Sequence, residues 1–340
     1  MHNPKVSICI PTYNGASFLS QTLRSVAKQT FEDYELIIVD DGSEDETLVI
    51  AEEFAAKDAR VRIFRNDERA GSSARNANRC LNHARGEWIK FLFQDDLMAP
   101  TCLARMLEAG RNRRFVICWH DYLFEPDVHD EVRNGYLSLP SLATTLPMAY
   151  ADIGTFCDAV LDRWNVNFIG PTSTSFIHRD CFTEYGPFSS EIVTFPDLEY
   201  WIRLGCREGL AIVPERLVTF RVHSDSISAK LRNQGARQYR HTLEPLLLLL
   251  NLARAPDYES MRARARARVP PVDPDLWLTR AALSARWTAI DTRFRQRNEP
   301  MLHEWNTFCR KHPELLEVLR DADAKDSAWS RVKRYLKARL

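Results

Sequence analysis

The front of the chain alternates short apolar runs with segments whose apolar residues recur at helical spacing. The apolar runs are predicted to be strands: Val6–Pro11, Tyr34–Val39, Arg60–Arg65, Trp88–Phe93 and Phe115–His120. Helices are predicted between them, over residues 17–29, 47–57 and from 71 to about 86. Strands that are apolar throughout indicate burial on both faces. The alternation therefore predicts an α/β fold, with a mostly parallel central sheet and helices on both faces.

Polar residues follow three of these predicted strands, at the point where each strand ends. They are residues 12–14, Asp40–Asp41 and Asp95–Asp96. The carboxyl ends of parallel strands meet at one edge of a sheet, and ligands bind beyond that edge. We therefore expect the three clusters to converge there.

The pattern changes toward the end of the chain. Residues 171–230 have mixed character, and from about residue 231 the spacing is helical and rich in arginine. We predict a first domain at 1–230 and a helical, basic C-terminal region at 231–340. The whole chain is electrically neutral, yet this region carries 22 Lys and Arg against 13 Asp and Glu. That excess suggests a partner for the C-terminal region.

The last residues suggest what that partner is. The segment Trp329–Leu340 places Trp329, Val332 and Leu336 on one helical face among basic residues. This pattern is typical of an interfacial helix on an anionic membrane, and a solvated helix or a packing arm explains it equally well. The hypothesis is peripheral contact with the inner face of the membrane.

The remaining composition indicates a soluble protein. Of the 340 residues, 45% are hydrophobic and 27% are charged, which is ordinary for a globular domain. The first residues form a strand pattern and predict no secretory signal, and the longest aliphatic run, Leu246–Leu250, is too short to span a bilayer. Eight scattered cysteines without a C-x-x-C pair predict reduced core thiols. We expect a cytoplasmic location.

Two adjacent carboxylates repel each other, and a divalent cation is the usual remedy. Mg²⁺ and Mn²⁺ favour oxygen ligands and often bridge carboxylates to substrate phosphates, which fits Asp95–Asp96. Carboxylates at strand ends also accept hydrogen bonds from ribose or base groups, which fits Asp40–Asp41. Either pair alone is explained by a helix cap or a solvated turn. Two pairs at two strand ends favour a ligand site.

Four segments, in this order and spacing, resemble the family 2 glycosyltransferases of the GT-A fold. They are VSICIPTYN (6–14), LIIVDDGS (36–43), GSSARN (71–76) and FLFQDD (91–96). The resemblance covers about residues 4–225. It implies a Rossmann-like sheet and an inverting, metal-dependent enzyme. Such an enzyme moves a sugar from a UDP- or dTDP-sugar to a hydroxyl of a carbohydrate or lipid-linked acceptor, in surface polysaccharide or glycolipid biosynthesis.

The resemblance also implies roles for single residues around the donor. Pro11, Thr12 and Tyr13 would line the nucleotide pocket. Asp40 would hydrogen-bond the base, with Asp41 beside it. Arg75 would approach the diphosphate or the ribose.

For the metal, Mg²⁺ or Mn²⁺, the resemblance implies a shared role of two carboxylates. Asp96 would be the main ligand, and Asp95 would bind ribose or metal. Family members more often have D-x-D-D here, and Phe93 stands in place of the first acid. His223, in a matching Arg-x-His segment, would complete the metal shell or touch the diphosphate; a structural histidine is the alternative.

The catalytic base is expected before a Trp-x-x-Arg-like helix. Asp197 takes this role by resemblance, with Pro196 in place of the usual first acid. Glu199 is a rival, and Asp197 as a simple helix cap is an alternative. The chemistry needs both parts of the site. The leaving diphosphate gains negative charge, and the attacking hydroxyl must lose a proton in a single inverting displacement.

Other function classes are weighed against this one. A nucleotidyltransferase also uses a parallel sheet, a metal and paired acids, but it usually needs a glycine-rich phosphate loop early in the chain. A non-catalytic nucleotide- or sugar-binding protein on the same scaffold is a further alternative. No nucleic-acid partner is expected, because the acidic first domain would repel a phosphate backbone.

Overall fold

The computed structural model describes residues 3–226, 229, 237–296 and 299–325. The chain divides into two compact units, Met1–Asn233 and Gln234–Leu340. The predicted membrane helix, Trp329–Leu340, lies outside the described residues. Within the part that is described, no helix combines the length and the apolar character needed to cross a bilayer.

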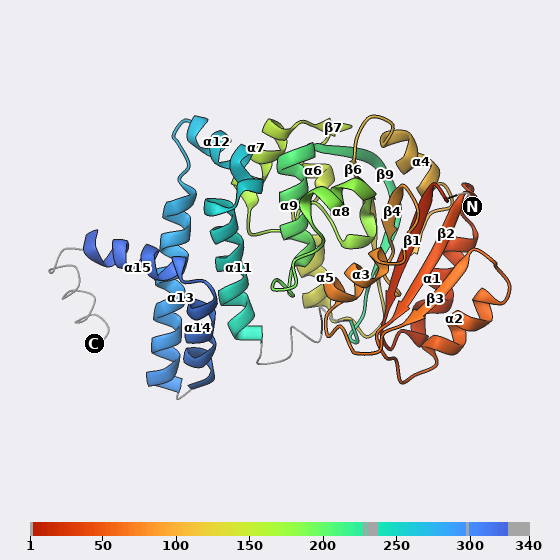
Figure 1. Ribbon diagram of the computed structural model, residues 1–340, viewed down its shortest axis with the longest axis horizontal. Helices are drawn as coiled ribbons and strands as arrows, with labels where there is room; N and C mark the ends of the chain where they lie inside the picture. The colour runs from red at the N-terminus through yellow and green to blue at the C-terminus, as the bar shows by residue number, and fades with distance from the viewer. Residues whose placement is uncertain (1–2, 227–228, 230–236, 297–298, 326–340) are drawn as a thin grey trace. The chain divides into compact units, whose positions relative to one another are not determined.

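Four parallel strands form the first half of the sheet of unit 1 (Figure 1). They are β1 (Val6–Thr12), β2 (Tyr34–Asp40), β3 (Val61–Arg65) and β4 (Trp88–Phe91). Val6 of β1 lies opposite Tyr34 on one side and Trp88 on the other. All residues of β1, β2 and β4 are buried, as expected for strands covered on both faces. The four strands agree with the predicted ones to within about two residues.

The second half of the sheet is mixed. β8 (Ser175–His178) is antiparallel to both β4 and β6 (Phe115–Phe124), and β9 (Leu210–Val222) is parallel to β6. Two short strands, β5 (Leu97–Met98) and β7 (Tyr150–Ala151), pair antiparallel with β9. The predicted α/β fold class is confirmed, but the sequence reading missed β8 and β9. β8 is only four residues long, and β9 has exposed residues in its middle.

Helices cover both faces of the sheet (Figure 1). One face packs on α1 (Ala16–Ala27), α2 (Thr47–Ala55) and α4 (Cys102–Ala109), where Leu19, Ala51 and Leu103 join the core. The other face carries α3 (Ser73–Leu81), α8 (Arg179–Tyr185) and α9 (Pro196–Glu208), and α7 (Ile153–Arg163) packs against α9. Two short helices, α5 (Asp130–Leu137) and α6 (Leu142–Thr145), follow β6.

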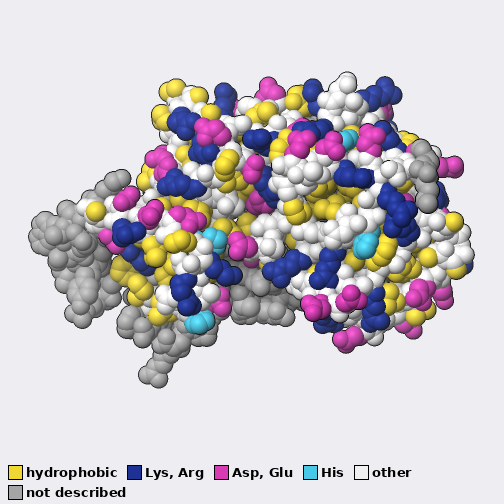
Figure 2. All heavy atoms as spheres, viewed as in Figure 1, with side chains coloured by type: hydrophobic (Ala, Val, Ile, Leu, Met, Phe, Trp, Pro, Cys, Tyr) yellow, Lys and Arg dark blue, Asp and Glu magenta, His cyan; other side chains and the backbone are white. Residues whose placement is uncertain are grey.

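The elements described in unit 2 are all helices, and residues 268–273 connect two of them. Its helices are α11 (Arg237–Arg254), η2 (Pro256–Tyr258), α12 (Glu259–Ala267), α13 (Pro274–Gln296), α14 (Glu299–Lys311) and α15 (Glu314–Lys325). α13 packs against α11, α14 and α15. Basic and acidic side chains are interspersed over the face seen in Figure 2, with hydrophobic side chains between them.

The contact between α7 and α9 gives a stability prediction. A Cβ on Gly205 would lie 2.2 Å from Cε1 of Phe156, a fully buried ring. Gly205→Ala should therefore lower the free energy of unfolding by about 1–3 kcal/mol through overpacking. Gly135 in α5 is the control, because a Cβ there meets nothing within 4 Å. Gly135→Ala should raise stability by about 0.5–1 kcal/mol. Urea unfolding of both variants tests this, and a Gly205→Ala variant as stable as the native chain would contradict it.

Candidate active site

The ends of the parallel strands bring three predicted clusters to one edge of the sheet. Asp41 N donates to Thr12 O over 2.8 Å, which joins the end of β1 to the turn after β2. The side chain of Asn76 on α3 donates to Thr12 O at 3.2 Å and to Val39 O at 3.1 Å. Thr22 Oγ1 on α1 donates to Gln94 O at 2.8 Å and so holds the loop after β4. The predicted clusters 12–14, Asp40–Asp41 and Asp95–Asp96 thus meet at this edge.

Asp40 is fully buried and holds the turn after β2. Its Oδ2 accepts from Gly42 N at 3.0 Å and Ser43 N at 2.9 Å. Its Oδ1 accepts from Thr12 Oγ1 at 3.2 Å and from Ser43 Oγ. Gly42 has φ +80°, a conformation that favours glycine. Both carboxylate oxygens are therefore occupied by the turn, and contact of Asp40 with a base stays a prediction.

Asp41 holds the neighbouring loop in the same way. Its Oδ1 accepts from Asn66 Nδ2 at 2.7 Å and Ala70 N at 2.5 Å, and its Oδ2 accepts from Gly71 N at 3.2 Å. This loop leads into α3, where Ser72 Oγ accepts from Arg75 N as the N-cap. Asp41 therefore fixes where α3 begins.

Gln94 fastens the loop after β1 to the loop after β4. Its Oε1 accepts from Tyr13 N at 2.9 Å, and its Nε2 donates to Tyr13 O at 3.0 Å. Gly15 is needed beside it, because a Cβ there would lie 2.3 Å from Gln94 Oε1. These two hydrogen bonds leave Tyr13 39% exposed, and the Arg69 guanidinium lies 4.5 Å from the centroid of its ring. Tyr13 is one of the predicted site residues, whereas Gln94 and Arg69 are not.

Asp95 and Asp96 point to different surroundings. Asp95 Oδ2 lies 3.1 Å from His223 Nε2, and their side chains are 22% and 10% exposed. Arg221 Nε donates to Asp95 O at 2.9 Å, and the Phe18 ring lies 4.5 Å from the His223 ring. Asp95 and His223, from loops more than a hundred residues apart, therefore form a carboxylate–imidazole pair at the sheet edge.

Asp96 is only 1% exposed and faces inward. Its Oδ1 accepts from Arg221 N at 3.0 Å and its Oδ2 from Ser173 Oγ at 2.5 Å. Burial, followed by the neighbouring Asp95 charge, holds the pKa of Asp96 well above its usual range. This geometry favours a supporting role for Asp96, and its expected place as the main metal ligand stays untested.

Two carboxylates near the start of α9, those of Asp197 and Glu199, differ in their partners. Glu199 is 2% exposed and is bound by Arg203 at 2.8 and 3.0 Å through both oxygens. Asp197 is half-buried, accepts from Asn167 Nδ2 at 3.0 Å and from Leu198 N at 2.8 Å, and has no cationic partner among the described residues. Burial raises the pKa of Asp197 to about 6, although these hydrogen bonds oppose the rise. Asp197 is thus better placed than Glu199 to accept a proton near neutral pH.

Helix α3 connects the sheet edge to the segment before Asp197. Asn78 Nδ2 donates to Phe188 O at 2.9 Å, and Asn78 Oδ1 accepts from Phe188 N at 3.0 Å. Arg75 Nη2 donates to Ser190 O at 3.1 Å, and its side chain is otherwise exposed. Its expected contact with a diphosphate is not tested by these bonds.

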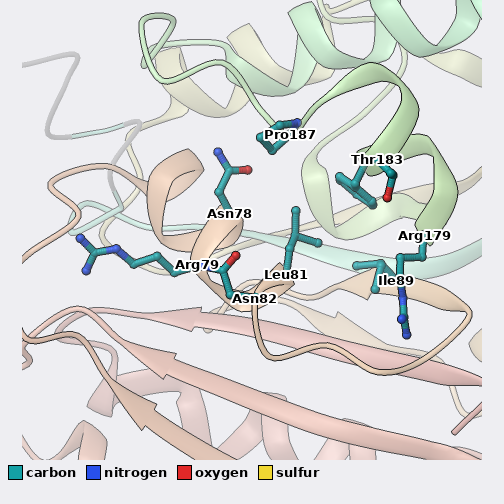
Figure 3. A pocket seen from close by; sticks show the side chains of 9 residues that line it. Asn78, Arg79, Leu81, Asn82, Ile89, Arg179, Thr183 and Pro187 are labelled. Carbon is teal, nitrogen blue, oxygen red and sulfur yellow. The ribbon is translucent and has the colours of Figure 1, made fainter. Parts of the chain in front are cut away.

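A separate cavity of about 380 Å³ lies beside α3 and α8 (Figure 3). Figure 3 shows Asn78 and Leu81 of α3, with Arg179 and Thr183 of α8, around it. None of the predicted site residues lines this cavity. The candidate site is therefore the open sheet edge rather than this hollow.

Comparisons with known proteins show which family the chain resembles. Residues 7–170 match the family model described as Glycosyl transferase family 2, which confirms the predicted resemblance. An uncharacterized protein of Mycobacterium tuberculosis is 29% identical over 231 residues, covering 63% of this chain and 66% of its own length. A GalNAc(5)-diNAcBac-PP-undecaprenol beta-1,3-glucosyltransferase of Campylobacter jejuni is 31% identical over 31% of this chain and 34% of its own. The chain thus spans less than two thirds of these relatives.

Solved structures share the fold at low sequence identity. S. aureus TarS 1–349 in complex with UDP-GlcNAc is 15% identical with a TM-score of 0.59, covering 93% of this chain and 81% of that one. Mannosyltransferase PcManGT of Pyrobaculum calidifontis, in complex with GDP-Man and Mn²⁺, is 17% identical with a TM-score of 0.52, covering 96% and 89%. These matches confirm the predicted GT-A fold with C-terminal helices.

The buried Glu199–Arg203 pair gives a second stability prediction. Glu199→Gln removes the charge that balances a buried guanidinium, so the free energy of unfolding should fall by about 2–4 kcal/mol. Glu87→Gln is the matched control, because Glu87 pairs with Lys5 at 2.6 Å on the surface, where both side chains are at least 40% exposed. The control should lose less than about 1 kcal/mol. Thermal unfolding measures both, and equal losses would refute the structural role of Glu199.

Proposed function

We propose that the chain transfers a sugar from a nucleoside diphosphate sugar to a hydroxyl acceptor, because residues 7–170 match the model of glycosyl transferase family 2. The acceptor is a carbohydrate or a lipid-linked sugar, and the product belongs to polysaccharide or glycolipid synthesis. One observation carries the proposal: the exposed Tyr13 ring and the Asp95–His223 pair meet at one sheet edge, and α3 joins that edge to the segment before Asp197. The family match favours sugar transfer over nucleotidyl transfer.

For the donor we propose a UDP-sugar first and a dTDP-sugar second, since uracil and thymine present the same hydrogen-bonding groups. Pro11, Thr12 and Tyr13 would form the nucleotide pocket, with the exposed Tyr13 ring stacking on the base. Asp40 and Asp41 would shape the turns that line this pocket. The TarS structures with UDP and UDP-GlcNAc, which share this fold, support a uridine nucleotide.

For the metal we propose that Asp95 and His223 bind Mg²⁺ or Mn²⁺. The buried Asp96 would stabilise the loop that carries Asp95, through its bonds to Ser173 and Arg221. The donor set fits: a partly exposed carboxylate oxygen lies 3.1 Å from an imidazole nitrogen. No cluster of three or more metal-binding side chains occurs among the described residues. Mg²⁺ is commonly held by one or two protein groups, with water and substrate phosphates completing its shell. When bound, the cation would neutralise charge on the leaving diphosphate.

For the proton we propose Asp197 as the general base. Asn167 fixes its Oδ2, and burial raises its pKa to about 6, so that it is ionised at neutral pH and still basic enough to take a proton. The acceptor oxygen would then displace the diphosphate in one step and invert the anomeric centre. Arg75, an exposed residue whose Nη2 donates to Ser190 O, would reach the diphosphate or ribose.

The pKa of Asp197 predicts the pH profile of transfer. Protonation disables the base, so kcat/KM should rise with pH through about 6 and level off above it. Asp197→Asn should lower kcat by about 10²–10⁴-fold. The control Asp162→Asn changes an exposed carboxylate on α7 and should leave the rate unchanged. A UDP-sugar screen with Mn²⁺ present, run from pH 5 to 8, measures all three. Full transfer by the Asp197→Asn chain would contradict the assignment.

The two adjacent carboxylates should respond differently to substitution. Asp95→Asn weakens a proposed metal ligand, so the Mn²⁺ concentration giving half-maximal UDP binding should rise about 10-fold or more. Asp96→Asn removes an acceptor from the Ser173 and Arg221 contacts, so thermal stability should fall while the Mn²⁺ dependence stays near that of the native chain. Calorimetric titration with Mn²⁺ and UDP, together with unfolding curves, separates the two. The reverse pattern, in which Asp96→Asn and not Asp95→Asn changes the Mn²⁺ dependence, would indicate that Asp96 is the metal ligand.

A further inference from the structure

Four half-buried rings gather beside the candidate site without a role in the mechanism above. This aromatic cluster consists of Tyr122 and Phe124 of β6, Tyr136 of α5 and Phe220 of β9. The Tyr136 centroid lies 5.5 Å from that of Tyr122, 6.3 Å from that of Phe124 and 6.2 Å from that of Phe220. Leu137, next to Tyr136 on α5, is 61% exposed, whereas Leu123 points to the opposite face of β6 from Tyr122 and Phe124. Because the four rings are half-buried, the cluster is partly accessible to a ligand.

On one side the cluster continues into the proposed metal site. Phe220 directly precedes Arg221, and Phe124 directly precedes Glu125, which accepts from Arg221 Nη1. Arg221 Nε donates to Asp95 O at 2.9 Å. Arg221 and Glu125 therefore link the strand ends that carry Phe220 and Phe124 to the loop that carries Asp95.

On the other side the cluster approaches the proposed base. The Tyr122 ring meets the His120 ring edge-on, with centroids 5.0 Å apart. His120 Nδ1 lies 3.6 Å from where a Cβ on Gly170 would be. Gly170 O accepts from Asn167 Nδ2, which also donates to Asp197. Burial lowers the pKa of His120 to about 4, so it adds no positive charge here at neutral pH.

One cation in this surface lacks an anionic partner. The Arg133 guanidinium of α5 lies 5.0 Å from the Phe124 centroid. Its Nε is buried without a hydrogen-bond partner, and none of the ion pairs found among the described residues includes Arg133. Buried polar atoms in native proteins are normally satisfied, and an arginine fork matches phosphate or carboxylate geometry. The missing partner is therefore best supplied by a ligand with negative charge.

We propose that the aromatic cluster and Arg133 form the acceptor subsite, and that its substrate is a saccharide carrying an anionic group. The rings would take the apolar face of a sugar, as aromatic side chains do in ligand pockets, and Arg133 would pair with the phosphate or carboxylate. This inference rests on the proposed function, because it names the substrate class of the same site. The cluster is linked to Asp95 through Arg221 and approaches Asp197 through His120 and Gly170, and an acceptor must lie near both carboxylates if they serve the donor and the proton.

The test uses the full chain on a glycan array with neutral, phosphorylated and uronic-acid oligosaccharides. We expect binding to anionic glycans, and the phosphate and carboxylate arms identify which anion is preferred. Titration with the best glycan should then show a loss of about tenfold or more for Arg133→Gln and for Tyr136→Leu. Arg113→Gln is the matched control, because Arg113 also covers an aromatic ring, that of Tyr150 at 3.7 Å, near the opposite end of β6. The control should bind as the native chain does.

Binding of UDP with Mn²⁺, measured on the same samples, separates the two proposals. Normal UDP binding with no anionic-glycan binding, or with full glycan affinity in both variants, would overturn the subsite. Glycan binding that depends on Arg133 without UDP binding would count against the proposed function and leave the subsite as a glycan site. Arg133 and Tyr136 are both half-buried residues of α5, and two variants of different chemistry keep the test decisive if one of them fails to fold.

Discussion

The arrangement of this site depends on burying carboxylates at the ends of β2 and β4. A buried carboxylate is costly unless hydrogen bonds replace its water. Asp40 is satisfied by two backbone N–H groups and the Ser43 hydroxyl of its own turn and by the Thr12 hydroxyl of β1, and Asp96 by Arg221 N and Ser173 Oγ. These bonds fix the loops after both strands. The groups left facing outward, Tyr13 and Asp95, therefore have defined positions before any ligand binds.

The same constraint explains why acidic pairs occur here. Both members of the Asp40–Asp41 pair hold loops, whereas at Asp95–Asp96 one member supports the loop and the other is available. Asp96 faces inward and Asp95 meets His223. The start of α9 shows a related division, because residues two apart on a helix face different directions. Glu199 is paired with Arg203, whereas Asp197 has a raised pKa and meets no cation in the described part of the chain.

The sequence predicted the part of the fold that depends on local pattern. The buried parallel strands and the order of motifs were read from apolar runs and strand ends, and the family match confirms them. It did not predict how Asp95 and Asp96 divide their roles, because the deciding partners, Ser173 and Arg221, lie 77 and 125 residues from Asp96. The aromatic cluster was missed for the same reason, since it is assembled from β6, α5 and β9.

Arg221 connects the proposed donor side of the site to the proposed acceptor side. Its N and Nε bind Asp96 Oδ1 and Asp95 O, its Nη1 binds Glu125 beside Phe124, and its Nη2 donates to Gln21 of α1 at 2.8 Å. The side chain is 3% exposed, and the Phe18 ring covers it at 4.5 Å. A residue of β9 tied to three other segments cannot move toward one without disturbing the others. The proposed metal pair and the aromatic cluster are therefore held in register by a buried cation that itself needs no contact with substrate.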